Sequence, residues 1–209
     1  MEGKIKVAIV EDDLEWIELL KIILFKEEDI LLVGVATNKD EAVRLSQALD
    51  QIDIFLVDIN LTENNLDGIF VALELRENNY PGKVIMLTSM IEEEIVQKSF
   101  VAGVSNYFLK KNAPELPSLI RKAYAERTPI EILANDYCRL KKEEKLKALT
   151  PAERQLYELA ESGMTRIEME RKLLKSENTI KGQIKKLLRK LEASNTKEAI
   201  RKVKSGGIL

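Results

Sequence analysis

The run Asp53-Ile-Phe-Leu-Val-Asp58 is the clearest fold signal in this 209-residue chain. The four residues between the two aspartates are all apolar. Such an unbroken run predicts a strand that is buried on both faces, as in a parallel sheet. Further short apolar runs predict neighbouring strands at residues 4–10, 30–36, 83–88 and 105–110.

Segments with helical spacing separate these runs. Apolar residues recur every three or four positions in residues 14–26, 40–49, 68–77, 92–101 and 115–125. Strands that alternate with helices predict an α/β fold, a doubly wound parallel sheet with helices on both faces. Ligands of such sheets bind at the carboxyl ends of the strands, near the point where the strand order reverses.

Polar residues stand at those carboxyl ends. Glu11 and Asp12 follow the first strand, Asp58 ends the third, Thr88 the fourth and Lys110 the fifth. Clustered carboxylates repel one another unless a cation lies among them, and Mg²⁺ prefers oxygen ligands of this kind. An aspartate beside a metal ion, with a hydroxyl and an ammonium group nearby, can accept and stabilise a phosphoryl group.

Residues 4–126 resemble the receiver domain of two-component response regulators, a flavodoxin-like (βα)5 phosphoacceptor module. The motifs that carry the resemblance are Glu11-Asp12 after the first strand, Asp58 after Phe-Leu-Val, Thr88 after Val-Ile-Met-Leu, and Tyr107-Phe-Leu-Lys110.

The resemblance implies a role for each matching residue. Asp58 would be the phosphoacceptor, with Thr88 and Lys110 bound to the transferred phosphoryl group. Tyr107 would be a rotamer switch that follows Thr88 inward. The implied cofactor is Mg²⁺, with the ligands Asp12, Asp58, the backbone carbonyl of Asn60 and, through water, Glu11.

The chain also departs from the family pattern. The loop between Asp58 and Gly68 is longer than usual and lacks the usual proline, and Lys111 stands where a proline is common. Two nearby residues have simpler interpretations. Asp13 is expected to cap the next helix, and Trp16 to pack among the apolar residues of that helix.

The charge of the chain is divided between its two parts. Residues 1–126 hold 23 acidic and 13 basic side chains, a net charge of −10, whereas residues 127–209 hold 12 and 20, a net charge of +8. An excess of positive charge suits a polyanion such as DNA.

Helix start signals dominate the basic part. Thr150-Pro-Ala-Glu153 and Thr165-Arg-Ile-Glu168 are capping boxes, and Ser176 and Asn195 can cap two further helices. Because each helix is short, the helices need a shared core, which predicts an all-α four-helix bundle. The tight corner at residues 174–176 makes the second and third helices a helix-turn-helix.

Residues 149–201 resemble the LuxR-type helix-turn-helix, so the chain as a whole resembles response regulators of the NarL/FixJ type. The motifs are Leu149-Thr-Pro-Ala-Glu-Arg, Leu159-Ala-Glu-Ser-Gly-Met-Thr, Ser176-Glu-Asn-Thr-Ile-Lys and Leu187-Leu-Arg-Lys-Leu. The third helix has a basic outer face, which suits the major groove of double-stranded DNA. The expected DNA contacts are Asn178, Thr179, Lys181, Gly182, Lys185, Lys186 and Arg189.

The composition excludes several function classes. Without histidine, the chain has no Ser-His or Cys-His nucleophile pair and no phosphohistidine. Its one cysteine, Cys138, excludes an internal disulfide and a cysteine-cluster zinc site. No apolar run approaches the roughly 18 residues that span a bilayer, so we expect a cytoplasmic protein with no membrane partner.

We therefore expect a receiver domain in residues 1–126, a linker in residues 127–148 and a DNA-binding domain in residues 149–209. In the expected function, a sensor histidine kinase phosphorylates Asp58 and so controls sequence-specific binding to a DNA operator and transcription. A second copy of the chain, in a homodimer, and RNA polymerase are the other expected partners.

Two alternatives remain open at this stage. One is a constitutive regulator that binds DNA without phosphorylation, which the long loop after Asp58 favours. The other is a phosphatase of the haloacid-dehalogenase type, which has a second aspartate two residues after its nucleophile. Here that position is Asn60, so we expect slow self-dephosphorylation and not a turnover enzyme.

Overall fold

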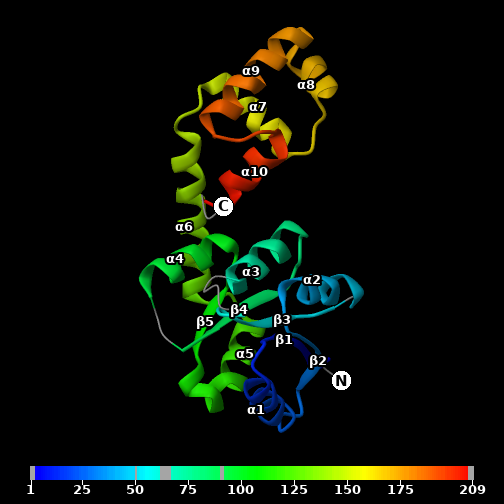
Figure 1. Ribbon diagram of the computed structural model, residues 1–209, viewed down its shortest axis with the longest axis vertical. Helices are drawn as coiled ribbons and strands as arrows, with labels where there is room; N and C mark the ends of the chain where they lie inside the picture. The colour runs from blue at the N-terminus through cyan, green and yellow to red at the C-terminus, as the bar shows by residue number, and fades with distance from the viewer. Residues whose placement is uncertain (1–2, 50, 62–66, 90–91, 207–209) are drawn as a thin grey trace. The chain divides into compact units, whose positions relative to one another are not determined.

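The computed structural model describes residues 3–49, 51–61, 67–89 and 92–206. Five parallel strands form one sheet in the order β2-β1-β3-β4-β5, as Figure 1 shows. The five strands predicted from the apolar runs are thereby confirmed. Their bounds are β1 Ile5–Val10, β2 Ile30–Ala36, β3 Ile54–Asp58, β4 Lys83–Thr88 and β5 Asn106–Leu109.

Helices connect the strands as the spacing predicts, so the α/β fold class is confirmed. Helix α1 starts at the Asp13 cap, whose carboxylate accepts hydrogen bonds from the backbone N–H groups of Glu15 and Trp16. A short 3₁₀ helix, η1, follows β5. The bounds are α1 Leu14–Leu24, α2 Lys39–Ala48, α3 Asp67–Glu77, α4 Glu93–Ala102, η1 Lys110–Glu115 and α5 Leu116–Ala125.

The apolar run of β3 is buried on both faces of the sheet. Ile54 and Leu56 face a core that contains Leu20 of α1 and Ile120 of α5. Phe55 points the other way, where its ring packs edge-on against Tyr80 at 5.2 Å between centroids. Side chains alternate along a strand, so a strand with helices on both sides must be apolar at every position.

The strand order reverses between β1 and β3. The chain leaves β1 for β2 on one side, then crosses to β3 on the other side. The carboxyl ends of β1 and β3 therefore lie side by side, in register up to Val10 and Val57. The residues that follow these two ends, Glu11 and Asp58, are brought together by the topology alone.

The rest of the chain is helical. Its contacts divide the molecule into two compact units, Met1–Asp136 and Tyr137–Leu209, and the division falls inside α6. Helix α6 covers most of the residues expected as a linker. The bounds of the helices are α6 Pro129–Leu146, α7 Pro151–Glu161, α8 Arg166–Leu173, α9 Glu177–Lys190 and α10 Thr196–Lys204.

The second unit is a bundle whose four predicted helices, α7 to α10, begin at the predicted caps. Both capping boxes form, and Ser176 and Asn195 accept hydrogen bonds from backbone N–H groups one turn into α9 and α10. The shared core includes Tyr157 of α7, Ile180 and Leu187 of α9, and Leu146 at the end of α6. No helix in the described part of the chain is long and apolar enough to cross a membrane.

One carboxylate links α7 to α9. Glu153, only 5% exposed, accepts hydrogen bonds from the Thr150 backbone N–H at 2.8 Å and from Lys190 Nζ at 2.7 Å. The hydrogen bond from Lys190, and next the one from Thr150, lower the pKa of Glu153 to about 2. The ionised carboxylate therefore stabilises the folded bundle.

We expect Glu153→Gln to lower the free energy of unfolding at pH 7 by about 1–2 kcal/mol. Because the folded pKa of Glu153 lies below its unfolded value, its stabilisation is present above the unfolded pKa. It is lost as the pH falls toward about 2. Urea unfolding of both proteins at pH 7 and pH 3.5 measures this, and the difference should shrink at pH 3.5. A difference that stays constant with pH would contradict the assignment.

Candidate functional site

Three carboxylates meet at the reversal point of the sheet. Oxygen atoms of Glu11, Asp12 and Asp58 all lie within 4.8 Å of one another. Glu11 and Asp58 are buried, whereas Asp12 is exposed. The structure thus brings together the three acidic residues that the sequence placed at one edge.

Lys110, the first residue of η1, extends its ammonium group into this acidic cluster. Its Nζ lies 2.7 Å from Glu11 Oε2 and 3.0 Å from Asp58 Oδ1. The residue is 7% exposed. A lysine this deeply buried needs charged partners, and the two carboxylates supply them.

Burial raises the pKa values of both Glu11 and Asp58, while the hydrogen bonds and charge of Lys110 oppose the increase. Backbone N–H groups of Ile59 and Asn60 also favour the ionised form of Asp58. Two buried carboxylates therefore share one ammonium group. Further positive charge at this cluster would stabilise their ionised forms.

The backbone after Asp58 runs close to α3. The Gly68 N–H donates a hydrogen bond to the Ile59 carbonyl at 3.0 Å. A Cβ atom at Gly68 would lie 2.0 Å from the Asp58 carbonyl oxygen. Only glycine allows this approach. Asn60 is exposed, and most of the long loop, residues 62–66, lies outside the described residues.

We expect Gly68→Ala to lower the free energy of unfolding by about 2–3 kcal/mol, because the added methyl group displaces the backbone that carries Asp58. Urea unfolding of the full chain measures the change. The matched control is Gly182→Ala in α9, where nothing lies within 4 Å of the added Cβ. That helix-interior change should stabilise by about 0.5–1 kcal/mol. Equal effects at both sites would contradict the close approach.

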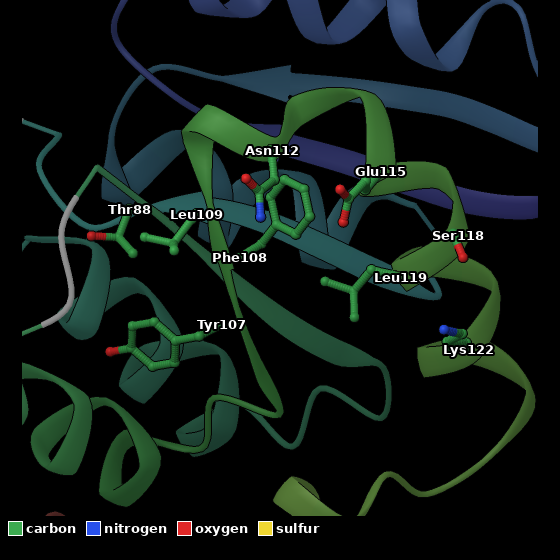
Figure 2. A pocket seen from close by; sticks show the side chains of 9 residues that line it. All are labelled: Thr88, Tyr107, Phe108, Leu109, Asn112, Glu115, Ser118, Leu119 and Lys122. Atoms are coloured by element: carbon green, nitrogen blue, oxygen red, sulfur yellow. The ribbon is translucent and has the colours of Figure 1, made fainter.

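Thr88 and Tyr107 lie on the neighbouring strands. Thr88 is buried at the end of β4, and both side chains line a pocket of about 410 Å³ (Figure 2). The Tyr107 hydroxyl is hydrogen-bonded to the Ser99 hydroxyl of α4 and, at 3.3 Å, to the Ile95 carbonyl. Burial raises the pKa of the Tyr107 phenol to about 12. In this structure Tyr107 is therefore held against α4.

Trp16 of α1 also belongs to the site. Lys110 Nζ lies 4.9 Å from the centre of its ring. The sequence assigned Trp16 to packing alone, whereas the structure places it against the buried ammonium group. Ser99 was likewise missed. Neither residue carries a local signal, because each contact joins elements that are distant in the sequence.

Helix α9 presents its predicted outer face to solvent. Lys181 pairs with Glu177 at 2.5 Å in an exposed (i, i+4) ion pair. Behind this face, Ile180 and Leu187 are buried in the bundle core. The exposed residues include all seven expected DNA contacts, Asn178, Thr179, Lys181, Gly182, Lys185, Lys186 and Arg189.

Residues 7–121 match the response regulator receiver domain family. The nitrate/nitrite response regulator protein NarL of Escherichia coli is 28% identical over 188 residues, 86% of each chain. The response regulator protein VraR of Staphylococcus epidermidis is 29% identical over 201 residues, 94% of each chain. These relatives align with both the sheet unit and the helical unit.

Solved structures show the same fold. RcsB of Salmonella typhimurium has a TM-score of 0.54 at 21% identity and covers 97% of this chain and 98% of its own. The response regulator domain of CheB from Thermotoga maritima has a TM-score of 0.53 at 28% identity. It covers 60% of this chain and 99% of its own.

The family match spans more than half of the chain and contains the whole acidic cluster. Receiver domains bind Mg²⁺ at an acidic pocket of this kind. The strand order β2-β1-β3-β4-β5 is that of flavodoxin-like sheets. The chain therefore belongs to the two-component response regulators, with a flavodoxin-like receiver followed by a helical C-terminal part.

Proposed function

We propose that this protein is a transcription regulator whose binding to a DNA operator is controlled by phosphorylation of Asp58. The observation that carries the proposal is the position of Asp58, buried at the sheet reversal and 3.0 Å from Lys110 within the acidic cluster. A carboxylate beside an ammonium group can take up a phosphoryl group, because the ammonium group offsets part of the added negative charge.

The proposed phosphodonor is the phosphohistidine of a sensor kinase. A bond forms between an Asp58 carboxylate oxygen and phosphorus while the phosphorus–nitrogen bond of the donor breaks. Lys110 then pairs with a phosphoryl oxygen, and the buried Thr88 hydroxyl donates a hydrogen bond to another. Because the chain has no histidine, the donor must be a separate protein or a small phosphodonor.

The donor set fits a magnesium ion, because carboxylate and carbonyl oxygens are the ligands it prefers. Asp12 and Asp58 would hold the ion directly, the Asn60 carbonyl would add a third ligand, and Glu11 would act through water. When bound, Mg²⁺ would neutralise charge on the phosphoryl oxygens. Glu11 and Asp58 also share the Lys110 ammonium group, at 2.7 and 3.0 Å.

The proposed switch runs from Thr88 to Tyr107. A hydrogen bond from Thr88 to the phosphoryl group would draw its side chain toward Asp58. Tyr107 would then leave Ser99 and turn into the space beside Thr88, in the pocket that both residues line. The surface formed by α4 and β5 would thereby have two states, and the adduct would favour one of them.

The proposed output is DNA binding by α9 within a domain of residues 149–209, joined by the linker 127–148 to a receiver of residues 1–126. The basic, exposed face of α9 supports this. RcsB, which shares the fold, has been solved in complex with DNA. Phosphorylation would favour a homodimer on two half-sites, where RNA polymerase would be the further partner.

The test is intact-mass spectrometry after treatment with acetyl phosphate and Mg²⁺, followed by genome-wide capture of bound DNA. We expect one phosphoryl adduct per chain, at Asp58, and discrete binding sites whose occupancy rises with the adduct. Discrete sites without an adduct would support the phosphorylation-independent regulator instead. Repeated turnover of a phosphate ester would support a phosphatase, and the absence of discrete sites would refute the proposed output.

A further inference from the structure

We propose that Trp16 is a positioning residue that holds the Lys110 ammonium group between Asp58 and Glu11. Through this contact Trp16 would favour the phosphorylated state and weaken the binding of Mg²⁺ to the unphosphorylated site. The inference rests on the proposed function of the same site and assigns it a further residue. It starts from the surroundings of Lys110 Nζ.

The ammonium group of Lys110 has three N–H donors and three described partners. Two are carboxylate oxygens, Glu11 Oε2 at 2.7 Å and Asp58 Oδ1 at 3.0 Å. The third is the Trp16 ring, whose centre is 4.9 Å away. With the residue only 7% exposed, the ring takes a place that water would hold around an exposed lysine.

The first turn of α1 places the ring there. Asp13 caps this turn by accepting hydrogen bonds from the backbone N–H groups of Glu15 at 2.8 Å and Trp16 at 3.3 Å. The next residue, Ile17, is buried in the core, as is Leu20 one turn later. The backbone of Trp16 is therefore held from both sides, and its half-buried ring lies beside the ammonium group.

An aromatic face attracts a cation through its quadrupole, and the attraction grows when water is excluded. Indole has the strongest face of the aromatic side chains. An aliphatic residue of similar size would cover Lys110 equally well but would not attract its charge. Substitution of Trp16 by an aliphatic or by another aromatic residue can therefore separate the shielding of Lys110 from water and the attraction of its charge.

The position of the ammonium group matters in opposite ways for the two ligands of the site. Before phosphoryl transfer it occupies the same carboxylates that would bind a cation, so holding it there opposes Mg²⁺. After transfer it faces the added negative charge, so holding it there stabilises the adduct. Removal of the ring should therefore strengthen Mg²⁺ binding and weaken the phosphoryl adduct. A general packing defect would not change the two in opposite directions.

The experiment compares the full-length wild type with Trp16→Leu and Trp16→Phe. We expect Trp16→Leu to lower the steady-state ratio of phosphorylated to unphosphorylated Asp58 in acetyl phosphate about threefold to tenfold, at saturating Mg²⁺. We expect the same variant to bind Mg²⁺ about twofold to fivefold more tightly in calorimetric titration. Trp16→Phe, which keeps an aromatic face, should recover most of both changes. The matched control is Ile22→Ala, an exposed apolar position on the same helix, which should change neither.

A spectroscopic measurement tests the contact independently of labelling. Trp16 is the only tryptophan of the chain, so its fluorescence reports on the ammonium group beside it. We expect Mg²⁺ to change the emission of the wild type and the change to be largely abolished in Lys110→Met. An emission that does not respond to Mg²⁺ in either protein would overturn the proposal.

The remaining outcomes separate this inference from the proposed function. If Trp16→Leu matches the wild type in labelling and Mg²⁺ affinity, or if both fall together, the positioning role is refuted. If the wild type itself is not labelled, the proposed function fails. Tighter Mg²⁺ binding by Trp16→Leu and the fluorescence response would then still support the Trp16–Lys110 contact.

Discussion

Replacing Asp58 by alanine is expected to abolish labelling by acetyl phosphate and Mg²⁺ and to remove the accompanying gain in DNA affinity. For the wild type we expect a gain of about tenfold, because coupling between two sites of a protein is typically about 1–3 kcal/mol. We expect no labelling of Glu11 or Asp12 in the variant, because Asp58 is the carboxylate that the proposed function assigns as the phosphoacceptor, buried 3.0 Å from Lys110. Intact mass and fluorescence anisotropy with captured operator fragments measure the two effects.

The variant should remain folded, so that loss of function is not confused with unfolding. Burial raises the pKa of Asp58, which means that its ionised form opposes folding at pH 7. Removing it leaves Lys110 paired with Glu11, and we expect no decrease in the free energy of unfolding. Asp40→Ala, at an exposed position of α2, is the matched control and should be labelled like the wild type. A gain in DNA affinity by Asp58→Ala would show that the trigger lies elsewhere.

The triple substitution Lys181→Ala, Lys185→Ala and Arg189→Ala should weaken operator binding by at least about 100-fold. Each side chain that contacts a base or phosphate typically contributes about 1–3 kcal/mol. The dependence of affinity on salt should also become shallower, by about one unit of slope for each phosphate-binding side chain that is removed. Anisotropy titrations over a range of salt concentrations measure both quantities.

The control removes the same charge from another part of the same unit. Lys147, Lys197 and Lys204 are exposed but lie outside α9, and their replacement by alanine should change affinity far less. Neither triple variant removes a core residue, so both should unfold near the wild-type urea concentration. Equal decreases in DNA affinity would mean that the affinity depends on the overall charge of the unit and not on the exposed face of α9.

Local sequence signals predicted most element boundaries. Caps such as Thr150 and Thr165 act within one turn, so their effect is readable without knowledge of the fold. Helix α6 shows the limit of such signals. In its first turn, Glu131 forms an ion pair with Lys83 of β4 at 2.9 Å. In its last turn, Leu146 is buried in the core of the helical bundle. These contacts are tertiary, so the spacing indicated a linker with some helix but not where the helix would be packed.

The order of strands and polar residues along the chain was enough to predict the charged centre of the site. Parallel strands bring their carboxyl ends to one edge, so Glu11, Asp58 and Lys110 converge whatever the details of packing. Their surroundings depend on packing, because the rotation of a helix against the sheet selects the side chain that reaches the site. That rotation placed Trp16 on the Lys110 ammonium group and Ser99 on the Tyr107 hydroxyl, contacts that no local periodicity encodes.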